Sequence, residues 1–169
     1  MKNDRIHKLV WAGLFTALTT VATMIIIPVP VLHGYANGGD ALVIVSAFLL
    51  GPVWGAVAAG LGSALSDLLS GFIIYSPATL IIKALMALAA GAILRSGKKR
   101  KNLFITVLAC ITAELIMIAG YFAFDSVIYG VKGAIGDIAG NGTQAIFAVI
   151  AGTALFYGLT RIPYVKKNF

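Results

Sequence analysis

The chain has 169 residues, of which 60% are hydrophobic and 11% are charged, and its formal net charge is +7. Soluble domains carry about 25% charged residues, so this composition and a mean hydropathy of +0.97 exclude an ordinary water-soluble protein. The apolar residues come in runs of bilayer-spanning length. They predict an all-α, polytopic membrane protein in which residues 1–169 form a single integral membrane domain.

The distribution of the basic residues argues against nucleic acid as a partner. Eleven of the thirteen Lys and Arg residues lie in three groups that flank apolar runs, at residues 2–8, 95–101 and 161–167. This is the positive-inside pattern, and it predicts a multi-pass protein of the cell (plasma) membrane with both termini in the cytoplasm. The basic groups would lie beside the head groups of the lipid bilayer.

The first predicted helix covers residues 6–27 and ends at Pro28, because proline cannot supply the amide that a continuing helix requires. Small side chains on one face would let another helix approach closely. This face either packs within the chain or docks a different membrane subunit, and its residues are Ala12, Gly13, Thr16, Ala17 and Thr20.

A polar loop with Asn37, Gly38, Gly39 and Asp40 follows, and a second helix is expected over residues 40–50. Eleven residues make about 16 Å of helix, too short for a hydrocarbon core of about 30 Å. Gly51 and Pro52 end it, and a third helix with many small residues is expected over residues 53–70. A short helix beside closely packed neighbours leaves open volume at one end of the bundle, with the polar loop as its rim.

Three further helices are expected over residues 78–94, 103–124 and 141–159, which makes a six-helix bundle with a short second helix. The connections at residues 28–39, 71–77 and 125–140 would then lie on the outer side.

Charged side chains inside a bilayer are costly, usually paired, and often functional. Asp67 and Lys83 flank a tight turn, so a structural ion pair between them is predicted; alternatively, Lys83 presents its cation to a ligand. Glu114 and Tyr121 share a helix face, as do Asn141 and Gln144. The predicted substrate-binding residues, all in the outer half of the bundle or at its midplane, are Asn37, Asp40, Tyr75, Lys83, Glu114, Tyr121, Asn141 and Gln144.

Several chemistries are not expected. No glycine-rich loop ends in Lys-Ser or Lys-Thr, so the chain lacks a Walker-type nucleotide site of its own. His7 and His33 are expected on opposite sides of the membrane, so neither a metal site nor a cofactor is predicted. No nucleophile–base pair stands out, which favours a non-catalytic protein over a membrane-embedded enzyme.

Several motifs resemble the substrate-binding S components of energy-coupling factor (ECF) vitamin transporters. They are Asn37-Gly38-Gly39-Asp40, Leu50-Gly51-Pro52, and the stretches at residues 62–71 and 77–83. The most similar group is named for riboflavin and also includes binders of pantothenate, hydroxymethylpyrimidine and vitamin B6. The resemblance is continuous over about residues 35–90.

The resemblance implies a high-affinity binding subunit of an ABC importer, with an outward-facing site. Such subunits work with a T-type transmembrane subunit and two ABC ATPases, and they are thought to reorient in the membrane to deliver the ligand inward. In this family the first helix docks the partner, and Gly13 to Ala17 is the nearest equivalent here. The mixture of one cation and at least one acid favours vitamin B6 (pyridoxine) or hydroxymethylpyrimidine, ahead of pantothenate or riboflavin.

A different class of function is an autonomous ion-coupled small-molecule carrier. In that case Asp67, Lys83 and Glu114 would form a relay across the membrane.

Overall fold

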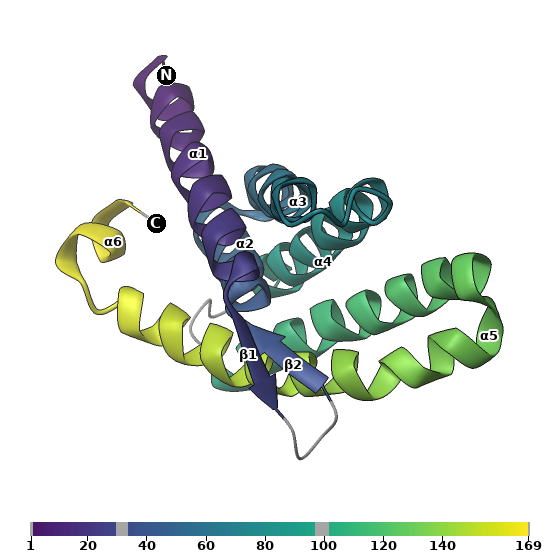
Figure 1. The fold of residues 1–169 in the computed structure, drawn as a ribbon. Coiled ribbons are helices and arrows are strands. Elements are labelled where there is room, and N and C mark those ends of the chain that lie inside the picture. Colours follow the sequence, from purple (N-terminus) through teal and green to yellow (C-terminus); the bar gives the residue numbers. More distant parts are fainter. Residues whose placement is uncertain (1, 30–33, 97–101, 169) are drawn as a thin grey trace.

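A computed structural model describes residues 2–29, 34–96 and 102–168 of the chain. In chain order its elements are α1 (Lys2–Met24), β1 (Ile26–Val29), β2 (Gly34–Asn37), α2 (Gly39–Leu50), α3 (Pro52–Leu69), α4 (Ser76–Ser96), α5 (Leu103–Leu159) and α6 (Pro163–Asn168) (Figure 1). His33 and the basic residues 98–101 lie outside the described residues. The predicted all-α membrane bundle with a short second helix is confirmed.

Helix α2 lies at the centre of the bundle and contacts α1, α3, α4 and α5. Eleven of its twelve residues are buried. A helix that is apolar on every side is covered either by protein or by lipid, and here the four neighbouring helices cover it. Phe48 of this helix packs edge-on against Phe156 of α5, with their ring centroids 5.0 Å apart. The helix that the sequence predicted to be short is therefore the central element of the fold.

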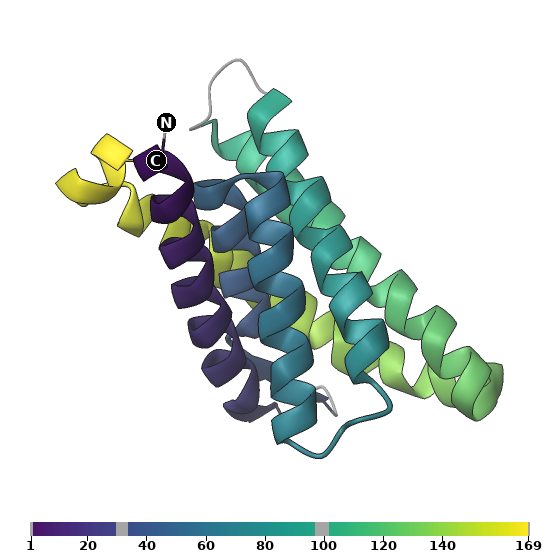
Figure 2. The ribbon, with the colours of Figure 1, turned by 90° about the horizontal axis from the view of Figure 1, so that it is seen from above.

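Helix α3 packs between α1 and α4, as Figure 2 shows, and glycines bring the backbones close together. At Gly60 an added methyl group would meet the carbonyl oxygen of Leu80 in α4. At Gly62 it would meet the carbonyl oxygen of Thr16 in α1. Small residues at helix contacts are typical of membrane bundles, where close packing replaces the hydrophobic effect as the main attraction between helices.

The connection between α1 and α2 differs from the loop predicted at residues 28–39. Helix α1 ends at Met24 rather than at residue 27, and the chain forms a short antiparallel hairpin in which Ile26 pairs with Asn37. Backbone pairing in this hairpin satisfies amides and carbonyls that would otherwise need other partners. The hairpin also fixes the position of Asn37 and the point at which α2 begins.

Helix α5 contradicts the predicted outer loop at residues 125–140. The chain is helical from Leu103 to Leu159 except at Gly130, where φ is 77° and ψ is 163°. This single break turns the helix back on itself, so that α5 is a hairpin of a first arm (103–129) and a second arm (131–159) (Figure 1). Asn141 therefore lies within the second arm, and the prediction that it begins a helix is wrong.

The bundle has two ends, and one of them is basic. The N terminus, the start of α5 and α6 lie at one end, which carries basic residues such as Arg161, Lys166 and Lys167 (Figure 2). The β-hairpin, the α3–α4 turn and the tip of α5 lie at the other, hereafter the turn end.

The outer surface is apolar, with side chains such as Leu69, Phe104 and Ile150 more than half exposed. Of the described helices, α3, α4 and α5 are long and apolar enough to cross a membrane. Lipid covers such a surface without the cost that water would impose.

The close approach at Gly62 gives a test of the packing. A methyl group there would lie 2.7 Å from the carbonyl oxygen of Thr16, whereas one at Gly13 would have no atom within 4 Å. We predict that Gly62→Ala lowers the free energy of unfolding by about 1–3 kcal/mol through overpacking. The control Gly13→Ala should leave it unchanged or raise it by up to about 1 kcal/mol. Denaturation in detergent measures both, and equal stabilities would contradict the packing described here.

Candidate functional site

A cavity of about 310 Å³ opens at the turn end of the bundle. Its wall combines the end of β2 with the last turn of α3, the start of α4 and both arms of α5. The lining residues are Thr23, Asn37, Asp67, Phe72, Tyr75, Thr79, Lys83, Tyr121, Asp125, Gly136, Asp137, Gly140, Asn141 and Gln144. A cavity of this size lies at the lower limit for small-molecule sites.

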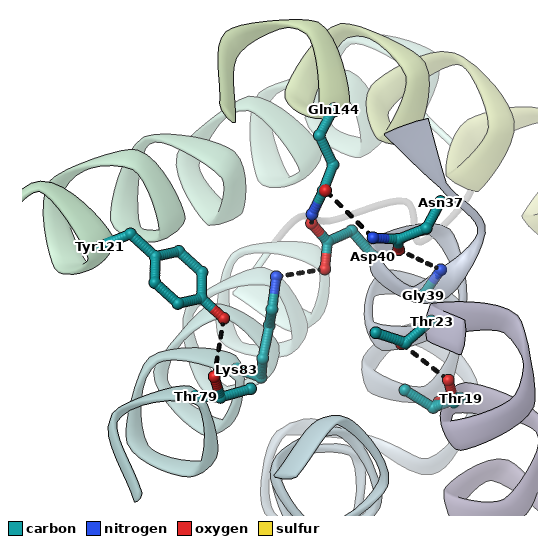
Figure 3. A network of polar contacts seen from close by, with 9 residues as sticks. All are labelled: Thr19, Thr23, Asn37, Gly39, Asp40, Thr79, Lys83, Tyr121 and Gln144. Atoms are coloured by element: carbon teal, nitrogen blue, oxygen red, sulfur yellow. Dashed lines mark hydrogen bonds and ion pairs between the residues drawn. The ribbon is translucent and has the colours of Figure 1, made fainter. Parts of the chain in front are cut away.

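Lys83 lies at the floor of the cavity and forms an ion pair with Asp40 behind it, with Nζ 2.5 Å from Oδ1 (Figure 3). Both residues are buried, at 3% and 1% exposure. Asp40 stands in the first turn of α2, where the helix dipole favours a negative charge. The predicted partner of Lys83 was Asp67, and that prediction is wrong. The prediction paired Lys83 with the acid across the tight α3–α4 turn. In the structure, α2 packs against α4, and its buried first turn brings Asp40 to Lys83.

Two amides extend this ion pair into a network. Gln144 donates from Nε2 to Asp40 Oδ2 at 2.6 Å, and its Oε1 accepts from Asn37 Nδ2 at 3.1 Å. Asn37 Oδ1 in turn accepts from the backbone amide of Gly39 at 2.9 Å. Figure 3 shows these contacts joining β2, α2, α4 and the second arm of α5. Every partner of the Asp40 carboxylate is thus fixed by a different element.

Lys83 also faces an aromatic wall. Its Nζ lies 5.3 Å from the centroid of the Tyr121 ring, within the range of a cation–π contact. The Tyr121 hydroxyl is 3.0 Å from Thr79 Oγ1 across the α4–α5 interface. Because an ammonium carries three donors and the ion pair uses one, two N–H groups of Lys83 have no hydrogen-bond acceptor among the described residues.

The rim at the turn end is formed by Tyr75 and Asp125. The Tyr75 hydroxyl donates to Asp125 Oδ1 at 3.0 Å, and its ring lies 5.2 Å from that of Phe124. Desolvation, together with hydrogen bonds to Tyr129 and Asp125, raises the pKa of the Tyr75 phenol above its ordinary value. Tyr75 therefore remains a neutral hydrogen-bond donor at physiological pH.

Glu114 lies apart from the cavity wall. It is 2% exposed, and neither carboxylate oxygen has a hydrogen-bond partner. It is close enough to Lys83 to interact electrostatically with the ammonium. Its predicted contact with substrate would therefore need a rearrangement of the side chains between Glu114 and the cavity.

Of the eight predicted substrate-binding residues, six line the cavity: Asn37, Tyr75, Lys83, Tyr121, Asn141 and Gln144. Asp40 lies directly behind the wall, hydrogen-bonded to two of them. Sequence reasoning missed Thr79, Asp125 and Asp137 as lining residues, and it placed Asp67 in an ion pair or a relay rather than among the substrate-binding residues. An acid in an otherwise apolar segment was the available signal for Asp125 and Asp137, but both were assigned to a loop.

The predicted docking face on α1 divides in two. Ala12 and Thr20 are buried, and Thr20 Oγ1 donates to the carbonyl oxygen of Gly62 in α3 at 2.9 Å. These two residues therefore pack within the chain, the first of the two roles expected for this face. Gly13 and Ala17 are exposed, and Thr16 is half-buried between the two groups.

The fold and the cavity define a membrane helical bundle with a polar cavity at one end. Comparison with known families makes this specific: residues 3–161 match the model of the family described as "ECF-type riboflavin transporter, S component". The chain belongs to this family, which confirms the resemblance seen in its motifs. It is also 34% identical over 143 residues to a protein of Pyrococcus woesei named "Uncharacterized protein in gap 3′region". That alignment covers 84% of this chain and 94% of the relative.

The buried ion pair gives a test of whether Asp40 or Asp67 is the partner of Lys83. Removing one partner of a buried pair costs about 3–5 kcal/mol, because the other charge stays buried alone. We predict that Asp40→Asn and Lys83→Met each destabilise the protein and that the double variant is much less unstable than their sum. In the matched cycle, Asp67→Asn with Lys83→Met should show a smaller coupling. A stronger coupling to Asp67, measured by denaturation in detergent, would restore the pair predicted from the sequence.

Proposed function

We propose that the chain is the high-affinity substrate-binding subunit of an ECF-type ABC importer for a small water-soluble vitamin or vitamin precursor. The observation that carries this proposal is the cavity of about 310 Å³, with its buried ion pair and polar wall, in a bundle of the S-component family. Apolar walls with a few placed polar groups are typical of small-molecule sites. The substrate-binding residues are the six predicted residues that line the cavity, supported from behind by Asp40.

The substrate is vitamin B6 (pyridoxine) or hydroxymethylpyrimidine. The small volume supports a single hydroxylated ring over the larger flavin after which the family is named. The Tyr121 ring beside Lys83 offers a surface for stacking, while the Thr79 hydroxyl and the Gln144 amide offer hydrogen bonds to ring substituents. Riboflavin and pantothenate are the alternatives.

Transport requires partners, because S components bind substrate and do not hydrolyse ATP. A T-type transmembrane subunit and two ABC ATPases would supply the energy, and the single membrane domain would reorient to deliver its ligand inward. The basic end of the bundle supports a cytoplasmic location for both termini in the cell membrane, with the cavity opening outward. On α1, the exposed Gly13 and Ala17 beside Thr16 are the remaining candidates for docking the T subunit.

Retention of the ligand gives the main test. Protein purified gently in detergent should carry about one vitamin-like molecule per chain, identified by mass spectrometry, and should bind it with sub-micromolar affinity. Uptake into vesicles should require the T subunit and the ATPases. Proton-driven uptake by the chain alone would instead support the autonomous carrier, with the unpartnered Glu114 as a candidate proton site.

A pair of hydroxyl deletions tests whether the cavity is the binding site. Tyr121→Phe removes a hydroxyl at the cavity wall, whereas Tyr157→Phe removes one that contacts Thr106 away from the cavity. We predict that Tyr121→Phe weakens ligand binding by about tenfold, because the Thr79 hydroxyl loses the hydrogen bond that orients it for the ligand. Tyr157→Phe should leave the affinity unchanged. Titration calorimetry measures both, and equal effects would contradict binding in this cavity.

A further inference from the structure

The acidic residues of this basic chain gather around one cavity. The sequence has six acidic residues, and Asp67, Asp125 and Asp137 line the cavity. Two more lie behind its wall, where Asp40 and Glu114 both interact with Lys83. Only Asp4, near the N terminus, is elsewhere in the sequence. The cavity is therefore the acidic region of a protein whose net charge is +7.

The cations at the cavity do not balance these acids. Lys83 is the only Lys or Arg among the lining residues of the described chain, and Asp40 already pairs with it. Among the described residues, Asp125 and Asp137 therefore have no ion-pair partner, and Asp67 has only the weaker attraction of Lys83. Of these, Asp67 Oδ2 is buried and has no hydrogen-bond partner. Carboxylates without an ion-pair partner favour a positively charged or proton-donating ligand.

The turn end of the cavity has the strongest concentration of negative charge. Asp125 on the first arm of α5 is 3% exposed and accepts one hydrogen bond, from Tyr75. Asp137 on the second arm is close enough to repel its charge. The two arms of the hairpin thus bring two carboxylates towards each other across the cavity, and a cation between them would relieve the repulsion.

The floor of the cavity has the opposite character. Lys83 is 3% exposed and retains two N–H donors beyond its bond to Asp40. A ligand group that reaches it must accept hydrogen bonds, as a ring nitrogen or a hydroxyl oxygen does. The cavity is therefore polarised, with acceptors towards the turn end and a cationic donor at its floor.

We propose that the cavity selects a ligand with a cationic or amino group at one end and a hydrogen-bond acceptor at the other. The amino group lies between Asp125 and Asp137, and the acceptor contacts Lys83. This inference rests on the proposed function and names its substrate class, an amino-substituted pyridine or pyrimidine. A ligand whose only charge is a carboxylate, such as pantothenate, would be repelled by the acids at the turn end.

Matched ligands test the proposal in the full-length protein. Pyridoxamine and pyridoxine differ by one aminomethyl group in place of a hydroxymethyl group, and hydroxymethylpyrimidine can be compared with its analogue that has an oxo group in place of the amine. Titration calorimetry measures the affinity of each compound. In whichever pair binds, we predict that the compound with the amino group has at least about tenfold higher affinity than its partner, the gain expected for a charge-assisted hydrogen bond. Salt should weaken the binding of pyridoxamine more than that of pyridoxine.

Variants locate the amino group. Asp137→Asn and Asp125→Asn should each lower the affinity for the amino ligand by about tenfold and change that for the hydroxyl or oxo ligand by less than about twofold. Asp137 is exposed, so its variant remains informative if the buried Asp125→Asn does not fold.

Three results would overturn the proposal: equal affinities within a pair, preference for the hydroxyl or oxo member, or Asp variants that weaken both members alike. The proposed vitamin transport would survive each of these. If none of the four compounds binds, the proposed substrates are wrong, and the compound retained on purification decides this inference. An amino or cationic group in that compound supports it, and the absence of such a group overturns it.

Discussion

The ion pair between Asp40 and Lys83 is the interaction on which the cavity depends. Two charges buried in a membrane bundle are tolerated only when each has partners, and here the partners come from different elements. Lys83 belongs to α4, Asp40 to the first turn of α2, and Gln144 to the second arm of α5, with Asn37 of the hairpin attached to Gln144. The network therefore fixes four elements at one end of the bundle and keeps Lys83 pointing towards the space between them.

That space exists because the central helix is short. Helix α2 has 12 residues, is buried on almost every side, and begins at the turn end only with Gly39 and Asp40. Its longer neighbours continue past it, and the glycines of α3 hold α1 and α4 close enough to close the sides. The resulting volume is filled neither by α2 nor by large apolar side chains. Threonine, tyrosine, amide and acidic side chains surround it instead. The chain that carries this polar cavity belongs to a family of vitamin-transporter S components.

Much of this architecture follows from the sequence. Hydrophobic run lengths predicted the helical membrane bundle and the short second helix, and the depth of the polar residues predicted six of the cavity's lining residues. The partner of Lys83 was not predictable in the same way, because Asp40 lies 43 residues away and only tertiary packing decides between it and Asp67. Both arms of the α5 hairpin were predicted, at residues 103–124 and 141–159, but a loop was expected between them. The helix breaks at Gly130 alone, one glycine among 19 in the chain. The expected loop also hid Asp125 and Asp137, which both line the cavity because the two helical arms face each other.

An experimental structure of the ligand-bound protein, determined with the compound that co-purifies with it, tests most directly whether this cavity is the binding site. We predict ligand density between α4 and the two arms of α5, with an acceptor atom within hydrogen-bond distance of Lys83 Nζ and the Asp40–Lys83 pair intact. Density for the ligand at another place in the bundle, or a cavity filled by side chains while ligand is bound elsewhere, would contradict this assignment.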